Sequence, residues 1–417
     1  MSSAPQTITQ KILARASGRT MVQPGDILHP EPELVIVHDG YVETVYRELR
    51  TLGYGRIASP DKVMFVTDHE VLYGSPKAAA RGAHIRKIAR EWGINQFYDV
   101  GQGGHGHIFP IEQGLVRPGM FLFAYDMHCT NFGALGAVAI GVGPEISTVL
   151  ATGTVWTQVP ETIRVVLHGG LAPGVHARDV GFVLAHGLSS NRWGVSPDYR
   201  VIEFDGPALR TLSLAAKVAL CNSITEIGVA NVVFPPPPGQ HINAVSSDPG
   251  ASFLHTIEIN LDDISAQIAL PGGPDRAVDL NTVLGRKIDH AFLGSCGSGM
   301  YEDFIDAASV IQGRRVASGV RFFVVPGTVA TAARLLNDGI QQIFLEAGAI
   351  FLPPGCGPCA GGMMAPLSDG EVSISTAATN HSGRFGSPGG QAYLASPLTV
   401  AASAVSGVIA ASGQPAR

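Results

Sequence analysis

Short apolar runs that end in polar residues alternate with amphipathic segments along most of the chain. Val63–Asp68 and Gly119–Asp126 have the pattern of buried strands, and Pro76–Trp92 has apolar residues at helical spacing. This alternation predicts an α/β protein built from several sheets, with functional groups gathered where the strands end. The same patterns predict further strands over Ile94–Gly101, His290–Cys296 and Val320–Gly327, and further helices over Glu302–Gln312 and Val329–Asp338.

The composition is apolar and poor in charge. Of the 417 residues, 45% are hydrophobic and 15% are charged. An ordinary soluble domain has about 25% charged residues. This balance excludes a disordered chain, which needs low hydrophobicity and high charge. The net charge of −6 leaves no basic excess for neutralising phosphates, so we expect no binding to nucleic acid.

No segment has the pattern of a signal peptide or of a membrane-spanning helix. The most apolar stretches are Asn131–Trp156, which contains Pro144 and Glu145, and the Ala/Ser-rich Ser396–Gly413. Neither supplies the roughly 20 strongly apolar residues that a membrane span needs. We therefore expect a cytoplasmic protein without membrane contact. An odd number of cysteines, five in all, also argues against a disulfide framework.

Three cysteines form the most informative pattern. Cys356 and Cys359 make a C-x-x-C pair in a Gly/Pro-rich loop, which is typical of metal or cluster binding or of a redox pair. Cys296 follows a predicted strand and is a candidate third ligand. Three cysteines suit a [4Fe-4S] cluster whose fourth iron stays open and acts as a Lewis acid. A zinc site and a small buried cysteine at position 296 are the alternatives, and Cys129 and Cys221 are interpreted as core residues.

Acid–base candidates gather in the first half of the chain, at predicted strand ends and in a glycine-rich turn. An aspartate next to an imidazole orients the ring and raises its basicity, which suits proton transfer. Satisfied structural histidines and an all-histidine metal site are the alternatives, although the latter gives the cysteines no role. The candidates are Asp68, His69, His105, His107, Asp126 and His128.

Two further residues are candidates for the same site. Glu226 lies in CNSITEIGV, where we expect a helix, and its alternative interpretation is an exposed helical charge. Arg384 lies in a polar, glycine-rich loop and could bind a substrate carboxylate through two parallel hydrogen bonds. A surface arginine is the alternative there.

A series of motifs in a fixed order resembles the aconitase superfamily, and within it the large subunits of the 3-isopropylmalate dehydratase and homoaconitase type. The resemblance covers nearly the whole chain. Its motifs are TDHE at Thr67–Glu70, GQGGHGH at Gly101–His107, YDMHCTNFGALG at Tyr125–Gly136, CNSITEIG at Cys221–Gly228, GSCGSGMYED at Gly294–Asp303, PPGCGPC at Pro353–Cys359 and GRFGSPGG at Gly383–Gly390.

The resemblance implies three α/β/α domains around a cluster site, without the swivelling fourth domain of the superfamily. The domains would span residues 1–162, with the acid–base residues, 163–284, and 285–417, with the cluster cysteines. In such enzymes a serine of the swivelling domain takes the carbon-bound proton. We therefore expect a separate small subunit that carries this domain.

The resemblance also assigns roles to individual residues. It implies that Cys296, Cys356 and Cys359 hold the [4Fe-4S] cluster, whose open iron binds the substrate hydroxyl and a carboxylate. Glu226 would lie near the open iron, and Arg384 would bind a carboxylate. The paired acid–base groups would be Asp68 with His69, His107, and Asp126 with His128.

The chain departs from the superfamily pattern next to Arg384. Ala378 and Thr379 stand where an asparagine and an arginine are usual, and Met127 stands where a serine is usual. A threonine cannot make the charge-assisted pair of hydrogen bonds that an arginine makes to a carboxylate. His105 and His381 are candidates for replacement contacts.

The sequence thus predicts a hydro-lyase that removes and re-adds water on a hydroxy di- or tricarboxylic acid of the isopropylmalate type. One alternative is a hydratase of a smaller diacid such as maleate, citraconate or dimethylmalate. A degenerate, non-enzymatic paralogue and a cysteine-based zinc protein are the others.

Overall fold

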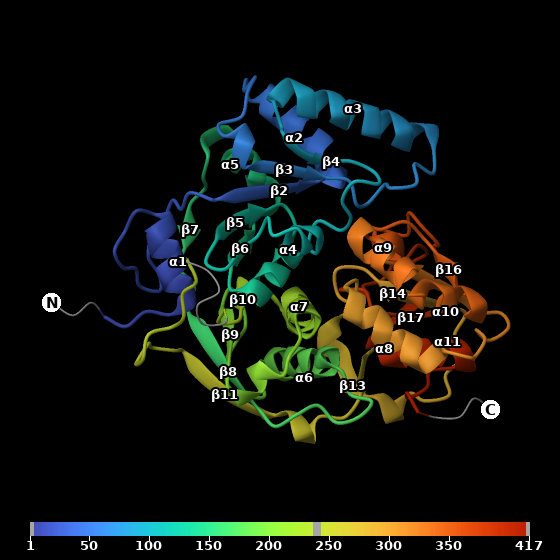
Figure 1. The fold of residues 1–417 in the computed structure, drawn as a ribbon. Helices are drawn as coiled ribbons and strands as arrows, with labels where there is room; N and C mark the ends of the chain where they lie inside the picture. The colour runs from blue at the N-terminus through green and yellow to red at the C-terminus, as the bar shows by residue number, and fades with distance from the viewer. Residues whose placement is uncertain (1–3, 237–242, 414–417) are drawn as a thin grey trace.

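The described residues form three large sheets with helices packed against them, and one small two-stranded sheet (Figure 1). The computed structural model describes residues 4–236 and 243–413. The predicted α/β class is confirmed, since parallel strands alternate with helices through most of the chain. The segment Pro235–Gly239, whose proline- and glycine-rich sequence predicts a loop, lies partly outside the described residues.

The first sheet is parallel throughout, in the order β4-β3-β2-β5-β6. Helices α2, α3 and α5 lie along one of its faces (Figure 1). Its strands are β2 (Leu34–His38), β3 (Val63–Val66), β4 (Gln96–Tyr98), β5 (Phe121–Ala124) and β6 (Val138–Gly141); its helices are α2 (Asp39–Thr51), α3 (Pro76–Trp92), α4 (Phe109–Glu112) and α5 (Ile146–Thr152). The N-terminal helix α1 (Ile8–Ala16) precedes them, and β1 (Ile27–Leu28) pairs antiparallel with β7 (Thr157–Gln158).

Both faces of this sheet are buried, which explains its uninterrupted apolar runs. Val35 and Phe65 face the helix-covered core, whereas their neighbours Ile36 and Met64 belong to a core shared with the second sheet. Successive side chains of a strand point to opposite faces, so a strand covered on both sides needs apolar residues at every position.

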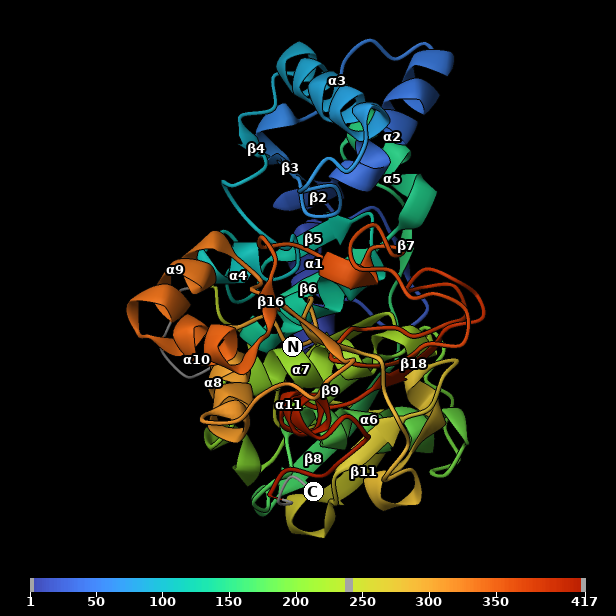
Figure 2. The same ribbon diagram turned by 90° about the vertical axis from the view of Figure 1, so that its right-hand side faces the viewer.

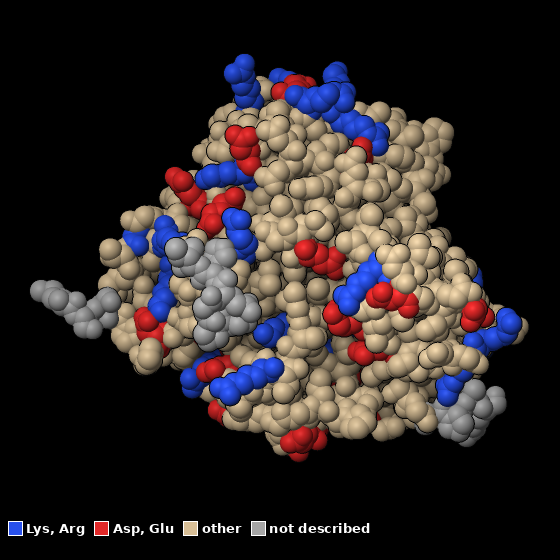
Figure 3. Space-filling model, in the orientation of Figure 1, with Lys and Arg blue, Asp and Glu red and all other residues tan. Residues whose placement is uncertain are grey.

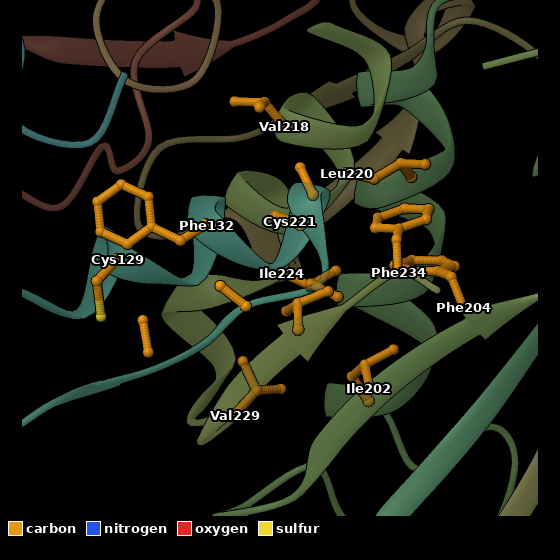
Figure 4. Close-up of a cluster of buried hydrophobic side chains, with 14 of the residues drawn as sticks. Cys129, Phe132, Ile202, Phe204, Val218, Leu220, Cys221, Ile224, Val229 and Phe234 are labelled. Atoms are coloured by element: carbon orange, nitrogen blue, oxygen red, sulfur yellow. The ribbon is translucent and has the colours of Figure 1, made fainter. Parts of the chain in front are cut away.

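The second sheet is also parallel, in the order β10-β9-β8-β11. Figure 4 shows part of the core that it shares with the first sheet, with Cys221 between Cys129 and Phe132 on one side and Phe204 and Phe234 on the other. Both cysteines are fully buried among apolar side chains, which confirms their interpretation as core residues. The elements are β8 (Thr162–His168), β9 (Val201–Asp205), β10 (Asn231–Val233), β11 (His255–Asn260), α6 (Ala177–Ser189) and α7 (Leu214–Ser223).

The third sheet is mixed, in the order β13-β12-β18-β17-β14-β15-β16. Strand β12 pairs antiparallel with both β13 and β18. Strands β12 and β13 precede residue 285, so they come from the predicted second domain. The division into domains at residues 162 and 284 stays a prediction. The elements are β12 (Gln267–Ala269), β13 (Ala277–Asp279), β14 (His290–Gly294), β15 (Arg321–Val325), β16 (Ile350–Phe351), β17 (Val372–Ser375), β18 (Gln391–Leu394), α8 (Tyr301–Ile311), α9 (Val329–Asn337), α10 (Ile340–Ala347) and α11 (Pro397–Ser406).

The surface matches the composition. On the face that Figure 3 shows, basic and acidic side chains are interspersed and most of the area carries no charge. Within residues 4–236 and 243–413, no helix is long and apolar enough to cross a membrane. The apolar stretch Asn131–Trp156 is divided among a 3-10 helix, a strand and a short α-helix.

The first and third sheets meet where their strands end. Gly104 forms an isolated bridge with Thr328, and a Cβ atom on Gly104 would lie 2.3 Å from the Gly327 carbonyl oxygen. Only a glycine allows this approach, because any side chain would collide with the neighbouring backbone. Helix α9 of the third sheet lies beside α4 of the first (Figure 2), where the Thr328 and Thr331 hydroxyls donate to Glu112. The loops that follow β3, β5 and β14 are thereby brought to one place.

A second close approach fixes the 3-10 helix η2 (Met127–Leu135), which follows β5. A Cβ atom on Gly133 would lie 1.6 Å from the carbonyl oxygen of Val232 in β10. We expect Gly133→Ala to lower the free energy of unfolding by about 3 kcal/mol, because the backbone must move apart. Gly170→Ala is the control, since a Cβ atom at Gly170 meets nothing within 4 Å. Urea unfolding measures both, and equal stabilities of the two variants would contradict this packing.

Candidate functional site

The carboxylate of Asp68 organises the histidines at the end of β3. Its Oδ2 lies 2.9 Å from His38 Nδ1 and accepts the backbone N–H of Gly106 at 2.8 Å. Its Oδ1 lies 2.7 Å from His69 Nδ1. Burial raises the pKa of Asp68, but His38 and His69 lower it by more, so that the pKa lies well below its ordinary value. The group is therefore a buried carboxylate anion with partners for both oxygens.

The same aspartate connects the first sheet to the C-x-x-C loop. The Asp68 carbonyl oxygen accepts the Cys356 backbone N–H at 2.8 Å. His105 Nε2 lies 3.2 Å from Cys356 Sγ, and burial lowers the His105 pKa to about 4, which keeps this ring neutral. Residues nearly 300 positions apart along the chain, such as His69 and Cys356, thus lie side by side, with Nδ1 and Sγ 3.9 Å apart.

His107 extends this group toward β5. Its Nε2 lies 3.1 Å from His38 Nε2 and 4.0 Å from Asp126 Oδ1. Burial and then the neighbouring His38 lower the His107 pKa well below its ordinary value, which keeps this ring neutral. Its Nδ1 is buried and has no hydrogen-bond partner among the residues the structure describes. A buried polar atom left in this way is available to a bound group.

A second acid–base group forms at the end of β5. Asp126 Oδ1 lies 2.7 Å from His128 Nδ1, and Glu226 Oε1 lies 2.9 Å from His128 Nε2. Burial lowers the pKa of His128, but Asp126, Cys296 and Glu226 together raise it by more, so that the pKa is well above its ordinary value. The ring is therefore an imidazolium between two carboxylates. His381 Nε2 lies 3.7 Å from the other oxygen of Glu226.

The prediction of a helix around Glu226 is wrong. Helix α7 ends at Ser223, and Glu226 lies in the 3-10 turn Thr225–Ile227, which stops at Gly228 with φ of +88°. The Thr225 hydroxyl donates to the Cys221 carbonyl, and this bond stabilises the tighter turn at the helix end. Glu226 is not an exposed helical charge, because the turn directs it to His128.

The three cysteines of the sequence pattern are buried and free, and the described residues contain no disulfide. Asn222 Nδ2 donates to Cys296 Sγ at 3.2 Å, and Arg384 Nη2 lies 3.8 Å from Cys359 Sγ. Burial raises the pKa of Cys359, but Arg384, His128 and Ser295 together lower it by more, which favours the thiolate. The thiolate is the form that binds metals.

The possible metal ligands include both sulfur and nitrogen donors: two groups contain a cysteine, whereas His38, Asp68 and His69, and His107, Asp126 and His128, form groups without sulfur. Sγ of Cys296 and a ring nitrogen each of His105 and His107 lie within 4.8 Å of one another. Sγ of Cys356, a ring nitrogen of His105 and a carboxylate oxygen of Asp68 do so as well. Soft thiolates select soft metals and iron–sulfur clusters, whereas histidine and carboxylate alone suit harder ions. The residues present therefore fit an iron–sulfur group.

Some groups near the site did not follow from the sequence patterns. His38 ends the apolar run Leu34–His38, so the same strand-end argument that found Asp68 would have found it. Arg178 is fully buried at the start of α6 and donates to the Ala377 carbonyl oxygen, which no local pattern indicates. Thr379, which stands where an arginine is usual in the superfamily, is buried, and within the described residues its hydroxyl has no partner.

The fold and the site together define an α/β protein whose strand ends bring free cysteines to paired imidazoles and carboxylates. The chain belongs to the aconitase family: the match to the Aconitase family (aconitate hydratase) covers residues 10–239 and 282–407. This match and the relatives named dehydratase large subunits show that it is a hydro-lyase, and the family implies an iron–sulfur cluster.

Two relatives illustrate the similarity. The chain is 37% identical to the 3-isopropylmalate dehydratase large subunit 1 of Methanopyrus kandleri, over 97% of this chain and 98% of the relative. It is 36% identical to the probable methanogen homoaconitase large subunit of Methanothermobacter thermautotrophicus, over 98% of each chain. The solved structure of aconitase X from Thermococcus kodakaraensis gives a TM-score of 0.48 at 11% identity, over 84% of each chain.

The role of Asp68 in this arrangement can be tested through stability. We expect Asp68→Asn to lower the free energy of unfolding by about 3 kcal/mol, because it removes a buried anion that two rings and a backbone N–H contact. Asp99→Asn is the control, since Asp99 pairs with the half-exposed Arg86 and its loss costs about 1 kcal/mol or less. Urea unfolding of the metal-free chains compares them, and an equally small loss at both positions would refute this role.

Proposed function

We propose that this chain is the large subunit of a two-chain dehydratase that acts on a hydroxy di- or tricarboxylic acid of the isopropylmalate type. The observation that carries the proposal is that free, buried cysteines lie beside two histidine–carboxylate groups. Sulfur ligands alone suit electron transfer or structure, and acid–base groups alone suit many reactions. Their combination suits the removal of water from a hydroxy acid.

Cys296, Cys356 and Cys359 are the proposed ligands of a [4Fe-4S] cluster. Three cysteines leave one iron without a protein sulfur, and a cluster bound in this way would supply a Lewis acid for the substrate hydroxyl. Burial of the three thiols and the hydrogen bond from Asn222 to Cys296 Sγ support this assignment.

His128 is the proposed donor of the proton that leaves with the hydroxyl. It carries a proton because Asp126 and Glu226 contact its two nitrogens, and Asp126 orients the ring. Glu226 lies where it can accept a hydrogen bond from the hydroxyl. Asp68 and His69 form the matching pair beside Cys356, and His107 lies between the two groups. The half-buried Arg384 guanidinium is the proposed partner of a substrate carboxylate.

A separate small subunit is part of the proposal. The relatives are named large subunits, and the match to each of them covers 97% or more of this chain. The small subunit would supply the swivelling domain and the base that takes the carbon-bound proton. Localisation in the cytoplasm stays an expectation.

A smaller diacid, such as maleate, citraconate or dimethylmalate, is the second candidate substrate. Ala378 and Thr379 favour a diacid over a tricarboxylic acid, because the buried Thr379 side chain supplies no charge for a further carboxylate. A panel of diacids, followed by the ultraviolet absorbance of the alkene with both subunits present, tells the two classes apart. Turnover of no hydroxy acid in the panel by a cluster-loaded pair of chains would favour the non-enzymatic alternative.

The ligand assignment predicts the metal content of variants. We expect Cys356→Ser to lose most of its iron after anaerobic reconstitution and to lose activity with it. Cys129→Ala is the control, because Cys129 is equally buried but lies in the apolar core, and it should keep its iron. Iron analysis with visible absorbance measures both. A Cys356→Ser chain that keeps full iron content would show that the ligands are misassigned.

The proton-donor assignment predicts a loss of turnover without a loss of cluster. We expect His128→Ala to lower kcat by about 10²-fold or more, as for removal of a general acid. His84→Ala is the control, since His84 is half-buried on α3 and contacts Glu43 of α2. Its kcat should not change. Unaltered kcat in His128→Ala with a normal cluster spectrum would exclude this role.

A further inference from the structure

Arg178 is a buried cation that lacks a buried anion for a partner. It lies in the first turn of α6, its side chain is fully buried, and its guanidinium lies 5.1 Å from the Phe182 ring centroid. Nη2 donates to the Ala377 carbonyl oxygen. Nε and Nη1 have no hydrogen-bond partner among the residues that the structure describes. Such a group is costly to bury unless something else compensates its charge.

The two nearby carboxyl groups, Asp179 and Asp303, accept hydrogen bonds from backbone N–H groups instead of pairing with the guanidinium. The Asp179 oxygens accept the backbone N–H groups of His176 and Gln267, and burial raises its pKa to about 7. Burial raises the pKa of Asp303 well above its ordinary value, and its Oδ2 accepts the Met300 backbone N–H. Within residues 4–236 and 243–413, neither makes an ion pair with Arg178.

The unpartnered edge of the guanidinium faces the cysteine loop. A Cβ atom on Gly297, directly after Cys296, would lie 2.3 Å from Arg178 Nη1 and 2.7 Å from the buried, unpartnered Oδ1 of Asn222. Glycine at position 297 therefore gives the guanidinium room beside the Cys296 backbone. After burial, which opposes it, the charged form of Arg178 is favoured by the negative charges of Cys296, Asp303, Asp179 and Cys359, in that order.

We propose that Arg178 is a positioning residue for the sulfur-bound cofactor. Its guanidinium compensates the Cys296 and Cys359 thiolates and thereby raises the reduction potential of the bound cluster. The inference rests on the proposed function, since it needs a cluster at these cysteines. A cation at this place favours the state of the cluster with one more electron, because the buried surroundings screen its charge weakly. The loss of this charge should make the cluster harder to reduce.

The test uses Arg178→Gln, which removes the charge but keeps an N–H donor for the Ala377 carbonyl. Arg178→Lys keeps the charge. Arg164→Gln is the matched control, because Arg164 also stacks on a phenylalanine, Phe253, but lies on β8 away from the cysteines. The readouts are potentiometric titration of the reconstituted full-length chain, followed by electron paramagnetic resonance, and urea unfolding of the metal-free chain.

We expect the ratio of reduced to oxidised cluster at a fixed potential to fall about tenfold in Arg178→Gln, which is about 59 mV for one electron. Arg178→Lys and Arg164→Gln should stay near the unaltered chain. The metal-free Arg178→Gln chain should be at least as stable as the unaltered chain, because it no longer buries an unpaired charge.

Two results would overturn the inference. One is an unchanged potential in Arg178→Gln. The other is a metal-free Arg178→Gln chain that is less stable or fails to fold, since the charge would then serve the fold itself. The proposed function fails separately: an unaltered chain that binds no iron–sulfur cluster would remove the cofactor before any variant is compared.

Discussion

The arrangement of the site depends on the buried carboxylate of Asp68. Its two oxygens contact His38 and His69 and accept the Gly106 N–H, and its backbone carbonyl accepts the N–H of Cys356. One residue thus joins the end of a strand in the first sheet to the cysteine loop of the third. A buried anion tolerates few arrangements, because each oxygen must keep its partners. The positions of the histidines and of the thiol follow from that requirement.

Charge is distributed unequally across the site, and this asymmetry supports acid–base chemistry. Asp126 and Glu226 keep His128 protonated, whereas burial keeps His105 neutral. Arg384 favours the thiolate of Cys359. Groups of the same type therefore have different protonation states a few ångströms apart, which is the usual arrangement in sites that both give and take protons.

Structural features that follow from short patterns of apolar and polar residues could be predicted from the sequence. Asp68 and Asp126 end apolar runs, and the helix Pro76–Trp92 is observed with its predicted bounds. The expected helix at Glu226 was wrong, because the end of α7 depends on side-chain hydrogen bonds that no periodicity indicates. Arg178 could not be found in this way, since its burial requires the packing of α6 against a loop about 200 residues later in the chain. The ligand and catalytic roles stay predictions.

The proposed chemistry requires that Cys296, Cys356 and Cys359 hold a cluster with one iron free of protein sulfur. Iron and acid-labile sulfide per chain, measured after anaerobic reconstitution and again after brief exposure to air, test it directly. We expect about four irons per chain after reconstitution, and then a three-iron electron paramagnetic resonance signal once air has removed the open iron. A chain that takes up zinc instead, or no iron at all, would contradict it.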